Sequence, residues 1–306
     1  MKVLVATDKP FAPSAIKEIM PIVEDAGYEF SLLEKYESPA QLIEAMKDAN
    51  AVIIRSDIIS ETVLNEAANL KIVVRAGAGY DNVDLKAASA KGVVVMNTPG
   101  QNSNAVAELA LGLMVYAARG LFNGKSGTEL KGKTLGIHAY GNVGKLVAKI
   151  AQGFGMTVGA YDPFVSSESI EADGVKVFDS VEELYSSSQY ISLHIPANEK
   201  TKKSINYDLL NKMPKGATLV NTARKEVIDE EGLLKLMADR TDFKYLSDIA
   251  PDNAGELLGK YEGRCYFTPK KMGAQTAEAN NNAGVAAANQ IVNFFKNGDT
   301  TFQVNK

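Results

Sequence analysis

A glycine-containing turn between two apolar stretches is the part of the sequence that most clearly predicts chemistry. The segment TLGIHAYGNVGKLVAKIAQGFGMTVGAYDP runs from an apolar strand pattern through a turn into a helical pattern and then a second strand pattern. Backbone N–H groups at a helix start bind pyrophosphate, and an acidic residue after the second strand binds ribose hydroxyls. The segment predicts a dinucleotide site formed by Gly141, Asn142, Val143, Gly144, Tyr161 and Asp162.

Two details refine this dinucleotide site. Ala139 stands where the first glycine of the usual G-x-G-x-x-G pattern is found, so the prediction depends on the whole strand–helix–strand–acid arrangement. Asp162 is followed by Pro163 and not by the serine or arginine that would favour a 2′-phosphate, which indicates NAD and not NADP. The alternative is an ordinary β-α-β unit that binds no ligand.

Composition limits the classes of protein to consider. The chain has 306 residues, 45% of them apolar and 23% charged, which is typical of a globular protein large enough for two domains. A net charge of −4 argues against nucleic acid as a partner, and no apolar stretch is long enough to span a membrane. A single cysteine, Cys265, excludes a disulfide framework and, with no signal-peptide pattern, favours the cytoplasm.

Apolar strand patterns alternate with helical patterns along the whole chain, which predicts an α/β protein with two doubly wound parallel sheets. Two long helical patterns, Asn102–Arg119 and Thr276–Lys296, connect the halves. We therefore expect a Rossmann domain at 99–278, inserted into a flavodoxin-like domain formed by 1–98 and 279–306.

Arginines follow several of the predicted strands. Arg55 and Arg75 end strands of the first half, and Arg224 follows a strand of the second. Ligands of open α/β sheets bind at the carboxyl ends of the strands, so these cations predict an anionic small-molecule substrate. Together with Lys270 and Lys271 they favour a substrate that carries several negative charges.

The sequence resembles the D-2-hydroxyacid dehydrogenases over most of its length. The segments that carry the resemblance are 70–114 (LKIVVRAGAGYDNVDLKAASAKGVVVMNTPGQNSNAVAELALGLM), 193–206 (LHIPANEKTKKSIN), 220–234 (VNTARKEVIDEEGLL) and 272–279 (MGAQTAEA). The resemblance implies a substrate domain built from both chain ends, a central NAD domain and a homodimer formed largely by the 102–119 region. It also implies a short form without the C-terminal regulatory domain that some relatives carry.

The resemblance further implies roles for individual residues. The substrate carboxylate would be held by Arg75, Ala76, Gly77 and Asn102, and Arg224 would polarise the reacting oxygen. Arg55 is a second anion contact predicted from its strand end and not from the resemblance. The cofactor would contact His194, Pro196, Thr222, Ala223 and Asp248, the last through the nicotinamide carboxamide. Relatives usually have two glycines after the arginine, where this chain has Lys225 and Glu226.

The catalytic acid/base is where the chain departs from the family. Relatives have a histidine before the G-A-x-T element, oriented by a glutamate, whereas this chain reads TPKKMGAQT there and has Asn253 at the glutamate position. Counting back from Gly273 places Lys271 at the histidine position, and counting forward from Pro269 selects Lys270. An ammonium has no tautomer to fix and needs no orienting carboxylate, so one explanation covers both changes.

Within the family, the several cations favour 3-phosphoglycerate over glycolate or lactate as the substrate. The expected activity is therefore the NAD-dependent oxidation of 3-phospho-D-glycerate to 3-phosphohydroxypyruvate, with a lysine as acid/base. Two alternatives stay open. One is a glyoxylate or hydroxypyruvate reductase of the same family, and the other is a protein that binds NAD and a partner but has lost catalysis.

Overall fold

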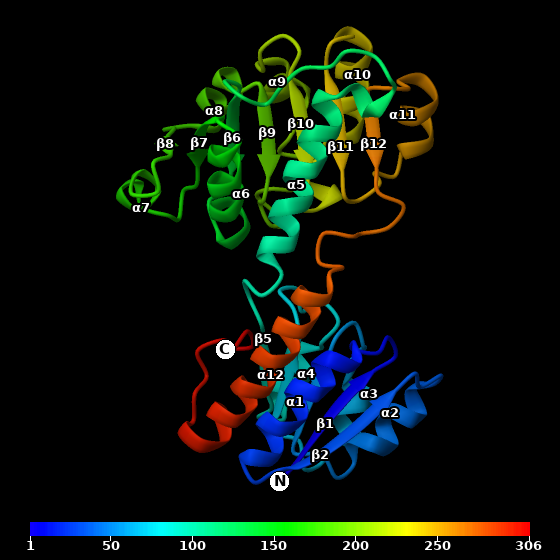
Figure 1. Ribbon diagram of the computed structural model, residues 1–306. Coiled ribbons are helices and arrows are strands. Elements are labelled where there is room, and N and C mark those ends of the chain that lie inside the picture. Colours follow the sequence, from blue (N-terminus) through cyan, green and yellow to red (C-terminus); the bar gives the residue numbers. More distant parts are fainter. The chain divides into compact units, whose positions relative to one another are not determined.

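The computed structural model describes all 306 residues, and the contacts within it divide the chain into two compact units. Unit 1 consists of Met1–Asn102 and Gln275–Lys306, and unit 2 of Ser103–Ala274. Unit 2 is thus inserted between the two segments of unit 1, and the boundaries lie within a few residues of 98 and 279 (Figure 1).

Unit 1 contains a five-stranded parallel sheet in the order β2-β1-β3-β4-β5, the order of flavodoxin-like folds. Its central strands consist almost entirely of buried aliphatic residues, as expected of a parallel sheet covered on both faces. The strands are β1 (Lys2–Thr7), β2 (Glu29–Glu34), β3 (Ala51–Ile54), β4 (Ile72–Arg75) and β5 (Val94–Asn97).

Helices cover both faces of this sheet. On one face α1 and α12 lie side by side, and Gly284 of α12 allows the close approach because a Cβ there would lie 2.6 Å from Ile19 Cδ1 (Figure 1). The other face is covered by α2, α3 and α4. The bounds are α1 (Pro13–Asp25), α2 (Pro39–Met46), α3 (Glu61–Glu66), α4 (Leu85–Ala90) and α12 (Ala277–Asn297).

Unit 2 contains a seven-stranded parallel sheet in the order β12-β11-β10-β9-β6-β7-β8. The order reverses between β6 and β9, and this is where open α/β sheets bind ligands. The sequence patterns did not predict the two edge strands, β8 and β12. The strands are β6 (Thr134–His138), β7 (Thr157–Tyr161), β8 (Lys176–Val177), β9 (Tyr190–Leu193), β10 (Thr218–Asn221), β11 (Lys244–Ser247) and β12 (Cys265–Phe267).

Two apolar layers enclose the sheet of unit 2. One layer includes α5 and α6, and the other includes α8, α9 and α10. The α/β prediction is therefore confirmed in both units, and no helix has the length and apolarity that crossing a membrane requires. The bounds are α5 (Ser103–Ala118), η1 (Gly120–Phe122), α6 (Asn142–Gly153), α7 (Ser167–Glu171), α8 (Val181–Ser187), α9 (Tyr207–Asn211), η2 (Lys225–Val227), α10 (Glu230–Asp239) and α11 (Ala254–Lys260).

Candidate active site

The glycine turn between β6 and α6 has the geometry of an anion site. Gly141 is the N-cap of α6 and has no side chain to cap the first N–H groups, and no atom lies within 4 Å of the Cβ position there. A Cβ on Gly144 would lie 2.4 Å from the Ala139 carbonyl oxygen, so the helix packs against the strand only with glycine at this position. The exposed helix start fits a pyrophosphate.

Ala139, which replaces the usual first glycine, adopts a left-handed backbone conformation with φ of 81°. A residue with a Cβ costs about 1–2 kcal/mol in this region relative to right-handed backbone. The turn therefore keeps the shape that glycine normally supplies, at a small cost in stability.

Asp162 lies beside this turn, directly after β7. Its Oδ2 accepts a hydrogen bond of 2.7 Å from the Tyr140 backbone N–H, and its Oδ1 accepts one of 2.8 Å from that of Phe164. A carboxylate has about four acceptor positions, so two remain for the hydroxyls of a ribose. Together with Asn142, Val143 and Tyr161 on the same turn and strand end, the arrangement fits the predicted adenosine half of a dinucleotide.

The Arg224 turn follows β10 and is shaped by a buried asparagine. Asn221 Nδ2 donates to the Arg224 carbonyl and Asn221 Oδ1 accepts from the Ala223 N–H, both at 2.9 Å. Arg224 Nη1 itself donates to the Ala223 carbonyl at 2.9 Å. The hydroxyl of Thr222 is buried without a protein partner, which is the kind of polar atom that a bound cofactor would satisfy.

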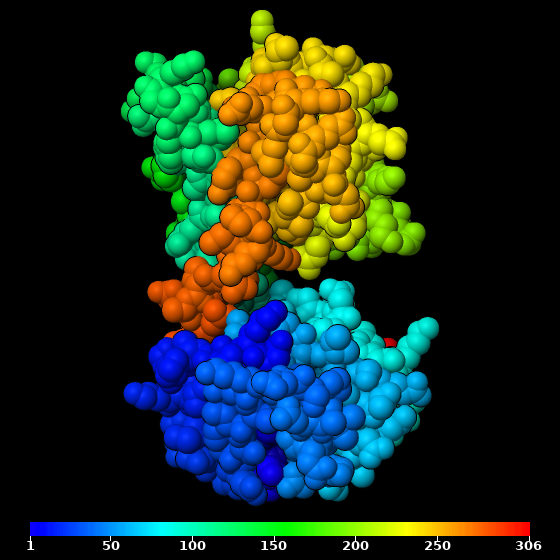
Figure 2. Space-filling model, turned by 90° about the vertical axis from the view of Figure 1, so that its right-hand side faces the viewer, coloured from blue at the N-terminus to red at the C-terminus, as the bar shows by residue number.

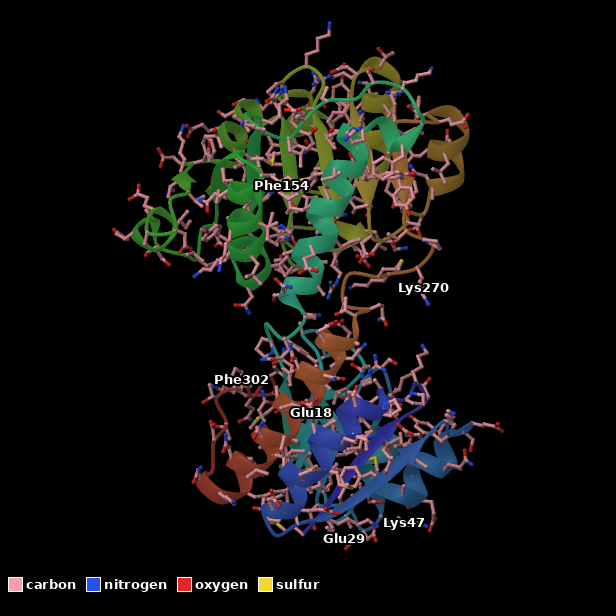
Figure 3. The ribbon with its side chains drawn as sticks, in the orientation of Figure 1. Glu18, Glu29, Lys47, Phe154, Lys270 and Phe302 are labelled. Carbon is pink, nitrogen blue, oxygen red and sulfur yellow. The ribbon has the colours of Figure 1, made fainter.

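The lysine loop (268–273) follows β12, which is the edge strand next to β11. Lys270 and Lys271 are both exposed on it. Figure 2 shows the orange part of the chain, to which the loop belongs, at the surface, and Figure 3 labels Lys270. Asp248, directly after β11, is only 1% exposed and accepts hydrogen bonds from the loop. Unit 2 thus attaches the loop that carries Lys270 and Lys271 to Asp248, and places Arg224 after β10, the strand next to β11.

No carboxylate side chain stands at position 253, where relatives have the orienting glutamate. Asn253 is held by Glu230, whose Oε2 accepts its backbone N–H at 3.1 Å. The neighbouring acids have lysine partners, since Asp252 pairs with Lys225, and Glu256 pairs with Lys260 at 2.7 Å. The lysine that replaces one family glycine is therefore used to tie the Arg224 turn to the loop after β11.

The two histidines occupy other positions in unit 2. His138 Nδ1 lies 3.2 Å from the Tyr185 hydroxyl, and His194 Nε2 lies 3.0 Å from Ser192 Oγ. Burial lowers the pKa of His138 to about 4 and that of His194 to about 3, so both rings are uncharged at neutral pH. His138 is a core residue, as predicted from its place in the first strand. The cofactor contacts of His194 and of the exposed Pro196 stay predictions.

These lowered histidine pKa values predict a pH-dependent stability. Between about pH 4 and the ordinary histidine pKa of about 6.5, the unfolded chain binds protons that the folded chain does not, so the free energy of unfolding falls as the pH falls through this window. His138→Gln removes one of these groups and should flatten the dependence of Tm on pH between 4 and 6.5. Thermal unfolding at several pH values checks this, and an unchanged slope would contradict it.

The predicted substrate contacts lie in unit 1 at the carboxyl ends of β3 and β4. Arg55 Nη1 donates to the carbonyls of Lys9 at 2.9 Å and Pro10 at 3.0 Å, and Nη2 donates to Asn280 Oδ1 at 2.7 Å. Three of its five N–H groups therefore anchor the loop after β1 and the start of α12, and two remain for a ligand. The structure thus gives Arg55 an anchoring role that the sequence did not predict.

Arg75 and the turn after it form a second group in unit 1. Arg75 Nε donates to the Arg55 carbonyl at 2.9 Å, and the guanidinium lies where a side chain on Gly77 would be. The Ala76 N–H donates to the Ile54 carbonyl at 2.8 Å, which joins the turn to β3. Asn102 is half-buried directly before α5 and belongs to unit 1.

Three buried polar residues that organise these turns were missed in the sequence. They are Asn221, Thr268 and Asp57, the last with its carboxylate accepting from the Asp8 and Arg55 N–H groups and from the Tyr36 hydroxyl. Asn221 and Asp57 come at or just after the end of an apolar strand, which is the signal that could have found them, whereas the strand before Thr268 is too short to be predicted.

Comparison with known proteins places this arrangement in a family. Residues 115–258 match the model of the D-isomer specific 2-hydroxyacid dehydrogenase NAD-binding domain. A hydroxypyruvate reductase of Thermotoga maritima is 35% identical over 283 residues, covering 86% of this chain and 90% of that protein. The chain belongs to the D-2-hydroxyacid dehydrogenases. The predicted family is thereby confirmed, and so is NAD as its cofactor.

Several similar proteins of this family are phosphoglycerate dehydrogenases. An NAD⁺-bound 3-phosphoglycerate dehydrogenase structure from Entamoeba histolytica is 49% identical, with a TM-score of 0.89 over 100% of this chain and 99% of that one. The enzyme of Methanocaldococcus jannaschii is 36% identical over 270 residues, covering 82% of this chain and 51% of that protein. This chain spans about half the length of the curated phosphoglycerate dehydrogenases that it matches.

Proposed function

We propose that this D-2-hydroxyacid dehydrogenase oxidises 3-phospho-D-glycerate to 3-phosphohydroxypyruvate with NAD, the first step of serine biosynthesis. The observation that carries the proposal is the likeness to the 3-phosphoglycerate dehydrogenase structure of Entamoeba histolytica, which extends over the whole of both chains at 49% identity. The cations of this chain agree with it, because a phosphorylated hydroxy acid requires more than one positive group.

In the proposed mechanism the substrate carboxylate binds Arg75 and the turn through Ala76 and Gly77, with Asn102 and the remaining donors of Arg55 as further contacts. Arg224 stabilises the negative charge that develops on the reacting oxygen. The Lys271 amine takes the hydroxyl proton as the C2–H bond breaks, and Lys270 lines the phosphate side. The turn at the start of α6 would hold NAD, which would supply the acceptor for the hydride that leaves C2.

The cofactor contacts proposed for this chain are all in unit 2. Gly141, Gly144 and Asp162 would bind the pyrophosphate and the adenosine ribose, as the open helix start and free carboxylate positions indicate. His194, Pro196, Thr222, Ala223 and Asp248 are proposed for the nicotinamide half. The homodimer and the cytoplasmic location stay predictions.

A specific observation also favours hydroxypyruvate reductase as a second candidate. This chain covers 90% of the Thermotoga maritima enzyme of that name, a larger share than it covers of the curated phosphoglycerate dehydrogenases. Such an enzyme would use the same anion contacts and the same lysine, in the direction of reduction and without a phosphate.

The first candidate is tested by following the absorbance of NADH that forms when the protein is mixed with NAD and 3-phosphoglycerate at alkaline pH. We expect kcat/KM for 3-phosphohydroxypyruvate reduction to exceed that for hydroxypyruvate and glyoxylate at least about tenfold, because each lost charged contact removes on the order of 1.5–3 kcal/mol. A preference for hydroxypyruvate would select the second candidate. NADH binding without turnover of any of these acids would indicate a non-catalytic protein.

A further inference from the structure

The buried carboxylate of Asp248 holds the backbone of the lysine loop on both sides of the two lysines. Its Oδ1 accepts the Met272 N–H at 2.7 Å and the Thr268 hydroxyl at 3.0 Å, and its Oδ2 accepts the Gly273 N–H at 2.8 Å. Three contacts to one buried carboxylate, two of them from consecutive peptide groups, make a rigid attachment, because charge-assisted hydrogen bonds are strong and buried ones are costly to break.

The packing around the loop leaves little room for another arrangement. A Cβ on Gly273 would lie 2.9 Å from Asp248 Oδ2 and 3.2 Å from Val106 Cγ2, so only glycine allows the peptide this close to the carboxylate. At the other end of the loop, the single hydroxyl proton of Thr268 is shared among three acceptors, which are the Asp248 carbonyl at 2.7 Å, the Lys270 carbonyl at 2.8 Å and Asp248 Oδ1 at 3.0 Å. The loop is therefore fixed before Lys270 and after Lys271.

The carboxylate is in turn attached to the strand end that carries the Arg224 turn. The Asp248 N–H donates to the Asn221 carbonyl at 3.0 Å, and the Ser247 hydroxyl lies at the same distance from that oxygen. Asn221 is the residue whose side-chain amide shapes the turn that ends at Arg224. A continuous set of buried hydrogen bonds thus connects the lysine loop to the turn of the arginine.

We propose that Asp248 is a positioning residue, which sets the distance between the lysine of the loop and Arg224 by fixing the loop backbone. The proposal rests on the proposed function, in which Lys271 moves the proton and Arg224 stabilises the charge on the same oxygen. It is separate from the contact to the nicotinamide carboxamide proposed for Asp248 above, because that contact would use the acceptor position of Oδ2 that the loop leaves open.

The first test is Asp248→Asn, which keeps the size of the side chain but turns an amide N–H₂ toward a loop N–H. We expect faster hydrogen exchange at the amides of Met272 and Gly273, and a fall in kcat of roughly 10–100-fold, the cost of a small misplacement of a catalytic group. The affinity for NADH, from fluorescence titration, reports any loss of the carboxamide contact separately.

A double-mutant cycle identifies how Asp248 acts. In a Lys271→Ala background, Asp248→Asn should lower kcat by less than about threefold, because the group that the loop positions is already gone. Thr268→Val keeps the Asp248 carboxylate and removes only the hydroxyl that contacts it. It should therefore lower kcat less than Asp248→Asn does, and it should also have little effect on kcat in the Lys271→Ala background. This milder variant keeps the test valid if Asp248→Asn does not fold.

Asp242→Asn is the matched control, because Asp242 also holds a backbone N–H of unit 2, that of Gly216 at 2.6 Å. We expect it to lower Tm without changing kcat. Unchanged exchange at Met272 and Gly273 in folded Asp248→Asn, or an equal loss of kcat in both backgrounds, would overturn the positioning role. An unaffected kcat in Lys271→Ala would instead overturn the acid/base of the proposed function, and the exchange measurement would still report whether Asp248 holds the loop.

Discussion

Lys271→Ala should lower kcat by roughly 10²–10⁴, the range expected when a general acid/base is removed, while NADH still binds. The lysine lies on a loop held to the end of β11, and the strand next to β11 delivers Arg224. Both histidines are uncharged at neutral pH and have hydrogen-bond partners elsewhere in unit 2. We therefore expect the residue that carries the proton to lie on the lysine loop and not at either histidine.

Lys270→Ala is the matched control for this prediction, since it removes the same functional group one position earlier on the same loop. We expect it to raise KM for the phosphorylated substrate and to change kcat by less than about tenfold. Methylamine added to Lys271→Ala should restore part of the activity, because a free amine can occupy the space of the lost side chain. If Lys270→Ala instead shows the large loss of kcat, the two lysines exchange roles, and if neither does, no lysine of this loop moves the proton.

The sequence predicted the whole sheet of unit 1 and the inner strands of unit 2, but not the two edge strands of unit 2. The alternation of apolar strands and helices is repeated over more than ten segments, and such a pattern has few solutions besides two parallel sheets. The edge strands β8 and β12 were missed because they have only two and three residues, too few to show any periodicity. Edge strands are paired on one side only, so their sequences carry a weaker apolar signal.

The sequence predicted which residues belong to the candidate site, but not which groups they form hydrogen bonds with. The carboxyl ends of parallel strands meet at one edge, so the positions of Asp162, Arg224 and Asp248 followed from the strand pattern. Several partners of these groups did not follow, because they are backbone groups distant in sequence, such as the Tyr140 N–H that Asp162 accepts and the Met272 N–H that Asp248 accepts. For the same reason the sequence showed Arg55 as a free cation, whereas its guanidinium binds two carbonyls of the loop after β1.

Gly77→Ala should raise KM for the hydroxy acid by roughly 10–100-fold, because it displaces the guanidinium of Arg75. A Cβ on Gly77 would lie 1.5 Å from Arg75 Nη1, and the residue has a φ of 149°, a conformation that side chains rarely adopt. The loss of a charged contact to the substrate, on the order of 1.5–3 kcal/mol, corresponds to this range of affinity.

The guanidinium of Arg75 should move in Gly77→Ala, and not the turn, because hydrogen bonds hold the turn on both sides. The Thr98 N–H donates to the Gly77 carbonyl at 3.0 Å, and Asn97 Nδ2 donates to the Ala78 carbonyl at 2.6 Å. Gly92→Ala is the matched control in the same unit, with a φ of 66° and no atom within 4 Å of its Cβ position. Backbone strain alone should lower Tm in both variants and leave KM unchanged in Gly92→Ala.

The KM of Arg75→Ala for the hydroxy acid, from steady-state kinetics, is the reference value. The KM of Gly77→Ala should approach it if the two substitutions remove the same contact to the substrate. The affinity for NADH should be the same in all these variants, because the cofactor residues belong to unit 2 and Gly77 to unit 1. A raised KM in Arg75→Ala with a normal one in Gly77→Ala would show that the guanidinium reaches the substrate from another position. A normal KM in both would remove Arg75 from the proposed substrate contacts and leave Arg55, Arg224 and the lysine loop as the cations.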